Sequence, residues 1–214
     1  MKKYMGLMLS TLAGCVLATS AHAEISLSNQ TFSNGFQSGT VSADGGSSSN
    51  VQAGEFRFDV DGSDKTLDAF CVDVTRTLNI PATYSVDSPA DADFQRVKDN
   101  LQSVTALYNL HYDSVTDSNS SAAFQVALWA LIYDNFSFNN FGATVNALAS
   151  DWIDSVGDWD GSNRFDFHVL SPKSPTKNQA LLTVKPSAVP APGALGLLGA
   201  GLLVLGVASR RRKS

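Results

Sequence analysis

The sequence has 214 residues, of which 43% are hydrophobic and 9% aromatic, and this composition supports one ordinary folded core. Its charge is uneven, because residues 24–188 hold nine Lys and Arg against twenty Asp and Glu, a net charge near −11. A field of this sign repels nucleic acid and anionic membrane surfaces, so we expect no nucleic-acid partner.

The N-terminus predicts a secretory signal peptide over residues 1–23. Two lysines follow the initial Met, an apolar run extends from about Tyr4 to Ala18, and Ala21-His22-Ala23 forms an A-x-A cleavage site. We therefore place the cut after Ala23. Lipidation of Cys15 is an alternative, but the apolar run continues past it, which favours the later cut. A buried N-terminal helix is the other alternative.

Alternating apolar and polar residues predict strands in the first half of the mature domain. Residues 24–54 are rich in Ser, Gly and Asn and specify short strands only weakly. The segment Glu55–Val60 alternates cleanly, and a turn at Asp61-Gly62 leads into a second strand over Leu67–Val74. We expect a third strand over about Thr77–Val86.

The apolar period then becomes helical. It predicts an amphipathic helix over about Ala92–Tyr112, a second helix over Ser121–Asp134 and a third over about Gly142–Val156. The second helix follows N-cap residues at Asp117–Ser120 and is apolar on every side, so we expect it to be buried.

The strand period returns in Phe165–Val169 and Ala180–Val184. Strands, three helices and strands again predict an α+β fold: an antiparallel β-sandwich or barrel core with an inserted three-helix lobe. We expect this domain to span residues 24–170, with the lobe at about 90–157. A final strand and a spacer follow over residues 171–188.

Residues 189–214 predict a hydrophobic tail with a basic end. A Pro-x-Pro motif at Pro190 and Pro192 precedes an apolar helix over 193–208, and the cluster Arg210–Lys213 follows. Sixteen helical residues extend roughly 24 Å, less than a hydrocarbon core of about 30 Å. Such a helix suits transient membrane anchoring, with the basic cluster in the cytoplasm.

This order of Pro-x-Pro, short apolar helix and Arg cluster resembles the PEP-CTERM sorting signal. The resemblance implies an exosortase that cuts near Pro190 and Pro192, and delivery to the cell envelope, cell surface or extracellular matrix. It also implies a Gram-negative host that makes exopolysaccharide. Ala191 stands where the family usually has Glu. A plain tail anchor is the alternative.

Two residues of the mature domain are candidates for a chemical role. Cys71 is its one cysteine, and an unpaired thiol in an oxidising compartment needs either burial or a chemical role. Between Ala122 and Tyr133, only Gln125 carries a strongly polar head, and burying it without partners costs roughly 2 kcal/mol. An inert core thiol and a hydrogen-bonded structural glutamine are the alternatives.

The segments Phe70–Asp73 and Phe124–Trp129 together resemble the thioester domains of bacterial surface adhesins. The resemblance implies a bond between the Cys71 sulfur and the side-chain carbonyl of Gln125, with Asp73 and Trp129 as supporting residues. It also implies a β-core with a helical lobe. The family often has Thr before this Gln and an acid after this Trp, where Phe124 and Ala130 stand here; either departure weakens activation of the carbonyl.

A thioester implies covalent attachment to an amine or hydroxyl group of a partner, which we expect to be an extracellular polysaccharide or a surface protein. The role would be adhesion, biofilm or matrix formation. Because the thioester is consumed once, we expect no turnover and do not predict an enzyme. The main alternative is a non-covalent carbohydrate-binding or structural matrix protein, for which Trp159 offers a sugar-stacking surface.

A cysteine hydrolase is the second alternative, and it needs His111 or His168 near Cys71. One cysteine and two scattered histidines lack the spacing of a zinc site. The Asp-rich segment Asp158–Asn163 lacks the ligand spacing and late Glu of a calcium loop. We therefore expect no metal and no cofactor.

Overall fold

The computed structural model describes residues 23–186. The predicted signal peptide upstream of Ala23, the alternative at Cys15 and the tail with Pro190 and Pro192 lie outside the described residues and stay predictions. Within the described range, no helix is long and apolar enough to cross a membrane.

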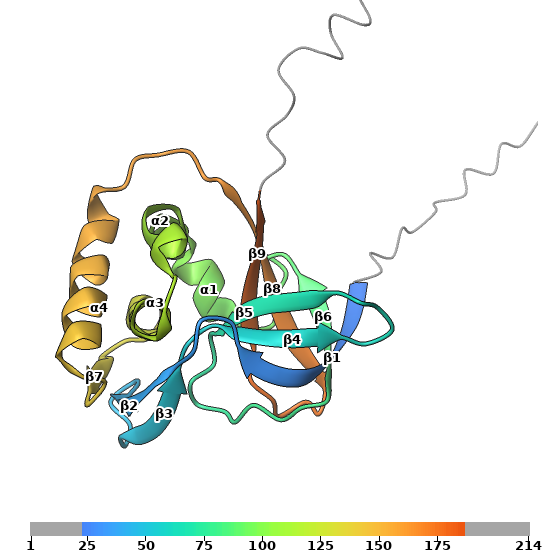
Figure 1. The fold of residues 1–214 in the computed structure, drawn as a ribbon. Helices are drawn as coiled ribbons and strands as arrows, with labels where there is room; N and C mark the ends of the chain where they lie inside the picture. The colour runs from blue at the N-terminus through green and yellow to red at the C-terminus, as the bar shows by residue number, and fades with distance from the viewer. Residues whose placement is uncertain (1–22, 187–214) are drawn as a thin grey trace, which may run out of the picture.

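Six antiparallel strands close into a barrel (Figure 1). Their order around the barrel is β1 (Ala23–Phe32), β4 (Phe56–Val60), β5 (Thr66–Cys71), β9 (Leu181–Pro186), β8 (Phe165–Ser174) and β6 (Ala82–Asp87). On β4, Phe56 and Phe58 are buried while Arg57 and Asp59 are exposed, as the alternation predicts. The barrel extends past residue 170, where we expected the domain to give way to a last strand and a spacer, because β8 and β9 both belong to it.

The helices lie on one side of the barrel, with α3 between α4 and the strands (Figure 1). They are α1 (Gln95–Asp99), α2 (Leu101–His111), α3 (Ser118–Ile132) and α4 (Ala143–Ser155), with 3-10 turns at Tyr112–Ser114 and Val156–Asp158. A separate sheet beside them has the order β3 (Ser49–Ala53), β2 (Gln37–Ser42), β7 (Ser137–Asn139). The predicted α+β fold with an inserted helical lobe is confirmed, and the core is a barrel rather than a sandwich.

Two predicted elements differ from the structure. The helix predicted over Ala92–Tyr112 is wrong as a single element, because it begins at Gln95 and breaks at Asn100. The Asn100 backbone is not helical, and its side-chain amide donates to the carbonyl of Arg96 at 3.0 Å, a local bond that competes with the helix.

The strand predicted to start at Thr77 begins only at Ala82. The residues before it form a loop whose backbone is held by the side chain of Asn178, which accepts from the Asn79 N–H at 2.8 Å and donates to the Asn79 carbonyl at 2.7 Å. Side-chain bonds from a distant turn thus replace the strand pairing that the sequence pattern predicted.

Helix α3 is the buried helix that the sequence predicts. A reciprocal cap starts it: the Asp117 carboxylate accepts from the Ser120 N–H at 2.8 Å, and the Ser120 hydroxyl oxygen accepts from the Asp117 N–H at 3.0 Å. Most of its side chains are buried, because the barrel, α2 and α4 cover its different faces. This helix carries Gln125 and Trp129 into the interior.

Glu55, just before β4, connects the barrel to the helical lobe through hydrogen bonds. Its backbone N–H donates to the Ser121 hydroxyl at 2.8 Å, and its carboxyl accepts from the Tyr112 hydroxyl at 2.6 Å. The side chain is only 4% exposed, and this burial raises the pKa of Glu55 to about 7. The folded protein therefore holds a proton on Glu55 at pH values where the unfolded chain releases it.

Replacing Glu55 with Gln is expected to change the pH dependence of stability. Because the folded-state pKa lies above the ordinary value of 4.5, wild type loses stability as the pH rises from about 4.5 to about 7. Relative to wild type, Glu55→Gln should gain about 3 kcal/mol between pH 4 and pH 8. Urea unfolding at both pH values measures this gain. The exposed Glu24→Gln is the control, and parallel profiles for Glu55→Gln and wild type would contradict the prediction.

Candidate functional site

Cys71 is the last residue of β5, at a point where its strand has only one neighbour. On one edge, Cys71 pairs with Leu181 of β9. On the other edge, pairing with β4 has already ended at Phe56 and Ala69. The backbone of Cys71 therefore needs another hydrogen-bonding partner on that side, since it is buried.

The side chain of Gln125 supplies this partner. Its carbonyl oxygen Oε1 accepts from the Cys71 N–H at 2.9 Å, and its Nε2 donates to the Cys71 carbonyl at 2.7 Å. Cys71 and Gln125 are each 1% exposed. The structure thus brings together the two residues of the predicted site, which lie 54 positions apart in the sequence, and it fixes the direction in which the carboxamide faces.

The thiol of Cys71 lies in an environment that keeps it neutral. Burial raises its pKa well above the ordinary value, and the Asp73 carboxylate raises it further. The indole N–H of Trp129 and the backbone N–H of Asp73 lie close enough to oppose this rise. Trp129 is itself buried, and its Nε1 makes no hydrogen bond to any described residue.

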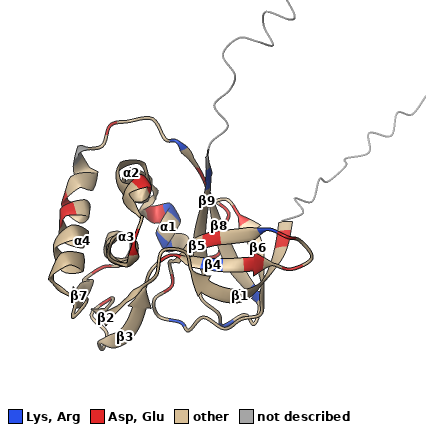
Figure 2. Cartoon of the chain, in the orientation of Figure 1, with Lys and Arg blue, Asp and Glu red and all other residues tan. Residues whose placement is uncertain are grey.

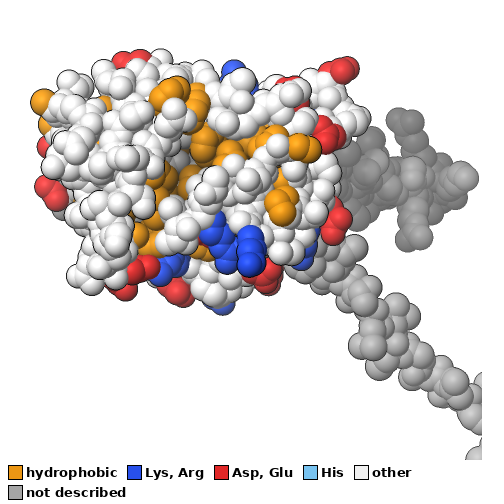
Figure 3. Space-filling model, turned by 90° about the horizontal axis from the view of Figure 1, so that it is seen from below, with side chains coloured by type: hydrophobic (Ala, Val, Ile, Leu, Met, Phe, Trp, Pro, Cys, Tyr) orange, Lys and Arg blue, Asp and Glu red, His pale blue; other side chains and the backbone are white. Residues whose placement is uncertain are grey.

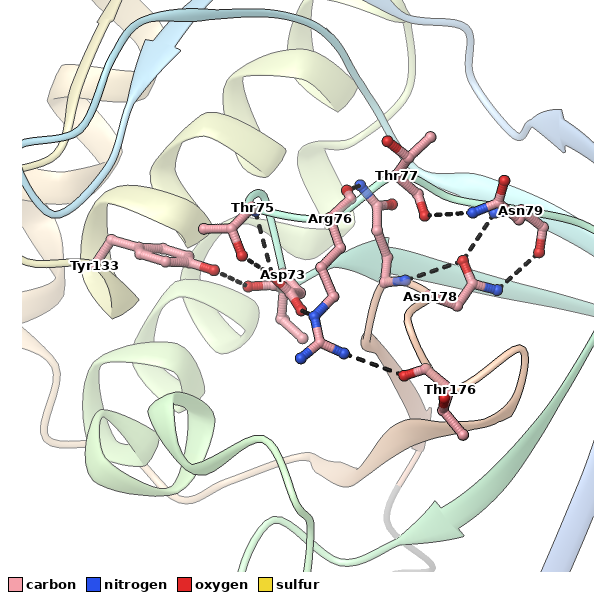
Figure 4. A network of polar contacts seen from close by, with 10 residues as sticks. Asp73, Thr75, Arg76, Thr77, Asn79, Tyr133, Thr176 and Asn178 are labelled. Atoms are coloured by element: carbon pink, nitrogen blue, oxygen red, sulfur yellow. Dashed lines mark hydrogen bonds and ion pairs between the residues drawn. The ribbon is translucent and has the colours of Figure 1, made fainter.

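Asp73 supports the site by holding the loop that follows Cys71 (Figure 4). One carboxylate oxygen accepts from the N–H and the hydroxyl of Thr75 at 3.2 and 2.6 Å, and the other pairs with Arg76 Nε at 3.1 Å. Arg76 also donates to the Thr176 carbonyl at 3.2 Å. Asp73 therefore acts on Cys71 through the loop and through its charge, and makes no hydrogen bond to Gln125.

Tyr133 is a supporting residue that the motif does not include. Its hydroxyl donates to the carbonyl of Val72 at 3.2 Å (Figure 4). Val72 directly follows Cys71, whose backbone makes the two bonds with Gln125. Gln125 and Trp129 lie one turn apart on α3, and Tyr133 follows four residues later as the residue that caps the C-terminus of the helix. This spacing of four was the available signal. Asn178, which holds the loop at Asn79, gave no sequence signal because it lies 99 residues away.

A cavity of about 550 Å³ connects Cys71 with the surface. Cys71, Trp129 and Phe56 line its buried end, and residues of β1, β3, the loop after Cys71 and the turn before β9 line the remainder. On the face below β1 and β3, apolar side chains gather in a hollow (Figure 3). A reactive group formed at Cys71 thus has a route by which a partner's nucleophile can approach.

The histidines considered for a hydrolase have other partners. The ring of His111 stacks on Trp152 with centroids 4.8 Å apart and bonds to the Ser155 hydroxyl at 2.7 Å. His168 pairs with Asp166 at 3.1 Å. Neither histidine makes a hydrogen bond to Cys71 in the described part of the chain.

The remaining candidates lie in the connection between α4 and β8. Asn163 uses its amide to bond Asn109 at 3.0 Å and the Phe165 carbonyl at 2.7 Å, and Trp159 is partly buried. Across residues 23–186, no group of three or more His, Cys, Asp or Glu is arranged to hold a metal ion.

Comparison with known proteins finds no matching family model and no matching curated protein. Similar solved structures come from three bacteria. The N-terminal domain of the Streptococcus pyogenes pilus tip adhesin Cpa is 16% identical with a TM-score of 0.46, over 63% of this chain and 84% of that one. The N-terminal thioester domain of a Clostridium perfringens surface protein, in a cysteine-to-alanine variant, is 11% identical with a TM-score of 0.47, over 62% and 88%. The thioester domain of the Staphylococcus aureus TIE protein is 16% identical with a TM-score of 0.44, over 76% and 78%.

Proposed function

We propose that this chain is an exported surface protein in which Cys71 and Gln125 condense to an internal thioester for covalent attachment to a partner surface. The observation that carries the proposal is the two-point pairing of the Gln125 carboxamide with the backbone of Cys71, in the interior and at the end of an open cavity. The resemblance of both sequence segments to thioester domains supports the same pair of residues.

The pairing favours attack of the Cys71 sulfur on the Gln125 carbonyl carbon. The Cys71 N–H already donates to Oε1, so it polarises the carbonyl and meets the negative charge that develops on this oxygen. The new bond joins sulfur to carbon, the carbon–nitrogen bond breaks, and the thiol proton leaves with the nitrogen as ammonia. Holding the two groups together offsets roughly 7–11 kcal/mol of a barrier that would be prohibitive in water.

The same burial that raises the pKa of the Cys71 thiol protects the product. Hydrolysis must release a thiolate, and a buried, weakly solvated thiolate is a poor leaving group. Trp129 is buried and lines the same cavity as Cys71, and in this proposal it limits the access of water to the sulfur. The thioester is therefore stored until a stronger or better-positioned nucleophile enters the cavity.

Attack by a partner's amine or hydroxyl releases the Cys71 thiol and leaves the acyl group of Gln125 bonded to the partner. Such a bond serves adhesion, a biofilm or an extracellular matrix, with a polysaccharide or a surface protein as the partner. From the predicted export signal and exosortase tail, we infer that this chemistry takes place outside the cell of a Gram-negative bacterium. Each molecule reacts once, so the protein is a single-use linker and not an enzyme.

Intact-mass spectrometry of the purified protein tests the proposal. The mass should be lower than that of the processed sequence by one ammonia, and no thiol should titrate after denaturation. Methylamine should then add its full mass and release one thiol. A folded protein with the complete sequence mass and a titratable Cys71 would instead identify Gln125 as a structural glutamine.

A further inference from the structure

The cavity above Cys71 has an apolar end and a neutral, hydrogen-bonding rim. Cys71, Phe56 and Trp129 form the buried end. The rim side chains share an uncharged amide or hydroxyl head and come from β1, β3, the loop after Cys71 and the turn before β9: Gln30, Ser49, Asn50, Gln52, Thr75, Thr77 and Gln179. Such heads match the hydroxyls of a sugar, while Phe32 offers a partly exposed ring to an apolar sugar face.

Two buried polar atoms of residues that line this cavity lack a hydrogen bond within the described chain. One is the donor Nε1 of Trp129, and the other is the acceptor Oε1 of Gln179. A hydroxyl both accepts and donates, so a ligand with several hydroxyls complements both atoms once the two side chains turn toward the cavity. A lysine ammonium only donates, and it leaves the Trp129 N–H unpaired.

The distribution of charge around the cavity also favours an uncharged ligand with hydroxyl groups over an ammonium group. None of the described residues that line the cavity has a carboxylate to bind an ammonium group or to take its proton. Among these described lining residues, the one cation is Arg76, and it is already paired with the buried Asp73. Acidic residues are spread over the helices, strands and loops (Figure 2), and the net charge near −11 of residues 24–188 repels polymers of uronic acid.

We infer that the partner is a neutral polysaccharide, which binds in this cavity and is esterified through one of its hydroxyls. This inference rests on the proposed thioester. In the reaction, the sugar oxygen bonds to the carbonyl carbon of residue 125 and the carbon–sulfur bond breaks. The hydroxyl proton ends on the Cys71 sulfur, so the adduct has the mass of the loaded protein plus the whole saccharide.

The test compares three probes with the loaded protein: a neutral glucan oligosaccharide, an oligogalacturonate and a lysine-rich peptide. Intact mass follows adduct formation, and methylamine measures the reactive thioester in the same sample. The glucan should react at least about tenfold faster than the oligogalacturonate at equal saccharide concentration, and faster than the peptide. Its adduct should be cleaved by hydroxylamine, as an ester is and an amide is not.

The possible failures are distinct. If methylamine reacts but the peptide reacts faster than the glucan, or the glucan forms no ester, the inferred partner class is wrong. The proposed thioester is still supported in that case. If the ammonia deficit and the methylamine reaction are both absent, the proposed function itself fails.

A matched pair of variants locates the binding site. Gln52→Ala removes an exposed amide from the cavity rim on β3, and Gln102→Ala removes an exposed amide from α2, away from the cavity. Gln52→Ala should lower the ratio of the glucan rate to the methylamine rate by about 3- to 10-fold, as expected for one hydrogen bond. Gln102→Ala should leave this ratio unchanged. Equal ratios in both variants would overturn binding at this cavity.

Discussion

Replacing Gln125 with Ala is expected to abolish methylamine labelling and to give a protein less stable than Cys71→Ala by about 2–4 kcal/mol. Both variants lack the thioester, so the difference compares the loss of the buried carboxamide with the loss of the buried thiol. Cys71→Ala keeps the two bonds between the Gln125 side chain and the backbone of residue 71, at 2.9 and 2.7 Å. Gln125→Ala leaves that buried N–H and carbonyl unpaired and opens a cavity in α3.

Urea unfolding of the two variants at neutral pH measures this difference. Asn109→Ala is a useful control, because it removes an amide that bonds the Thr105 and Arg164 backbones at the exposed side of α2, far less deeply buried than Gln125. Equal stability of Gln125→Ala and Cys71→Ala would contradict a stabilising role for the two hydrogen bonds between Gln125 and the backbone of Cys71. The argument that these bonds position the two residues for thioester formation would then be wrong.

Opening the thioester with methylamine is expected to lower the free energy of unfolding of wild type by about 4 kcal/mol. The bond between residues 71 and 125 links positions 54 residues apart, and in the chain-entropy description a link of that span restricts the unfolded chain by about this amount. The effect is large relative to the stability of an ordinary domain.

The comparison requires unfolding curves of loaded wild type, methylamine-treated wild type and Cys71→Ala with and without methylamine. The treated wild type should approach Cys71→Ala, and methylamine should not change the variant. If methylamine shifted both proteins equally, its effect would come from the solvent rather than from loss of a covalent link.

The sequence predicted the elements whose signals are local. The polar residues Asp117–Ser120 and the apolar run after them identify α3 and its burial, because capping and helical periodicity act within a few residues. The alternation around Phe56 and Phe58 likewise identifies β4. The break at Asn100 was missed, since its side-chain bond to Arg96 competes with a periodicity that continues across it.

The motif around Cys71 and Gln125 was sufficient to select the two central residues of the site. Its support was only partly visible. Tyr133 caps the C-terminus of α3 four residues after Trp129 and could have been found from the spacing. The side chain of Asn178 could not, because a polar residue in a turn carries no sign of the loop that it will hold across 99 positions.

By itself, the sequence determined the succession of strands, helices and strands without the short β7, and the buried character of α3. Its motif resemblance selected the pair of residues that meet in the interior. Only the tertiary structure decided that the strands close into a barrel, that β2 pairs with β7 through Thr40 and Asn139, and that a polar-rimmed cavity opens above Cys71. The reason is physical. Periodicity and capping depend on residues that are neighbours along the chain. Strand partners and cavity walls depend on packing between segments far apart in the sequence, for which the sequence carries no local signal.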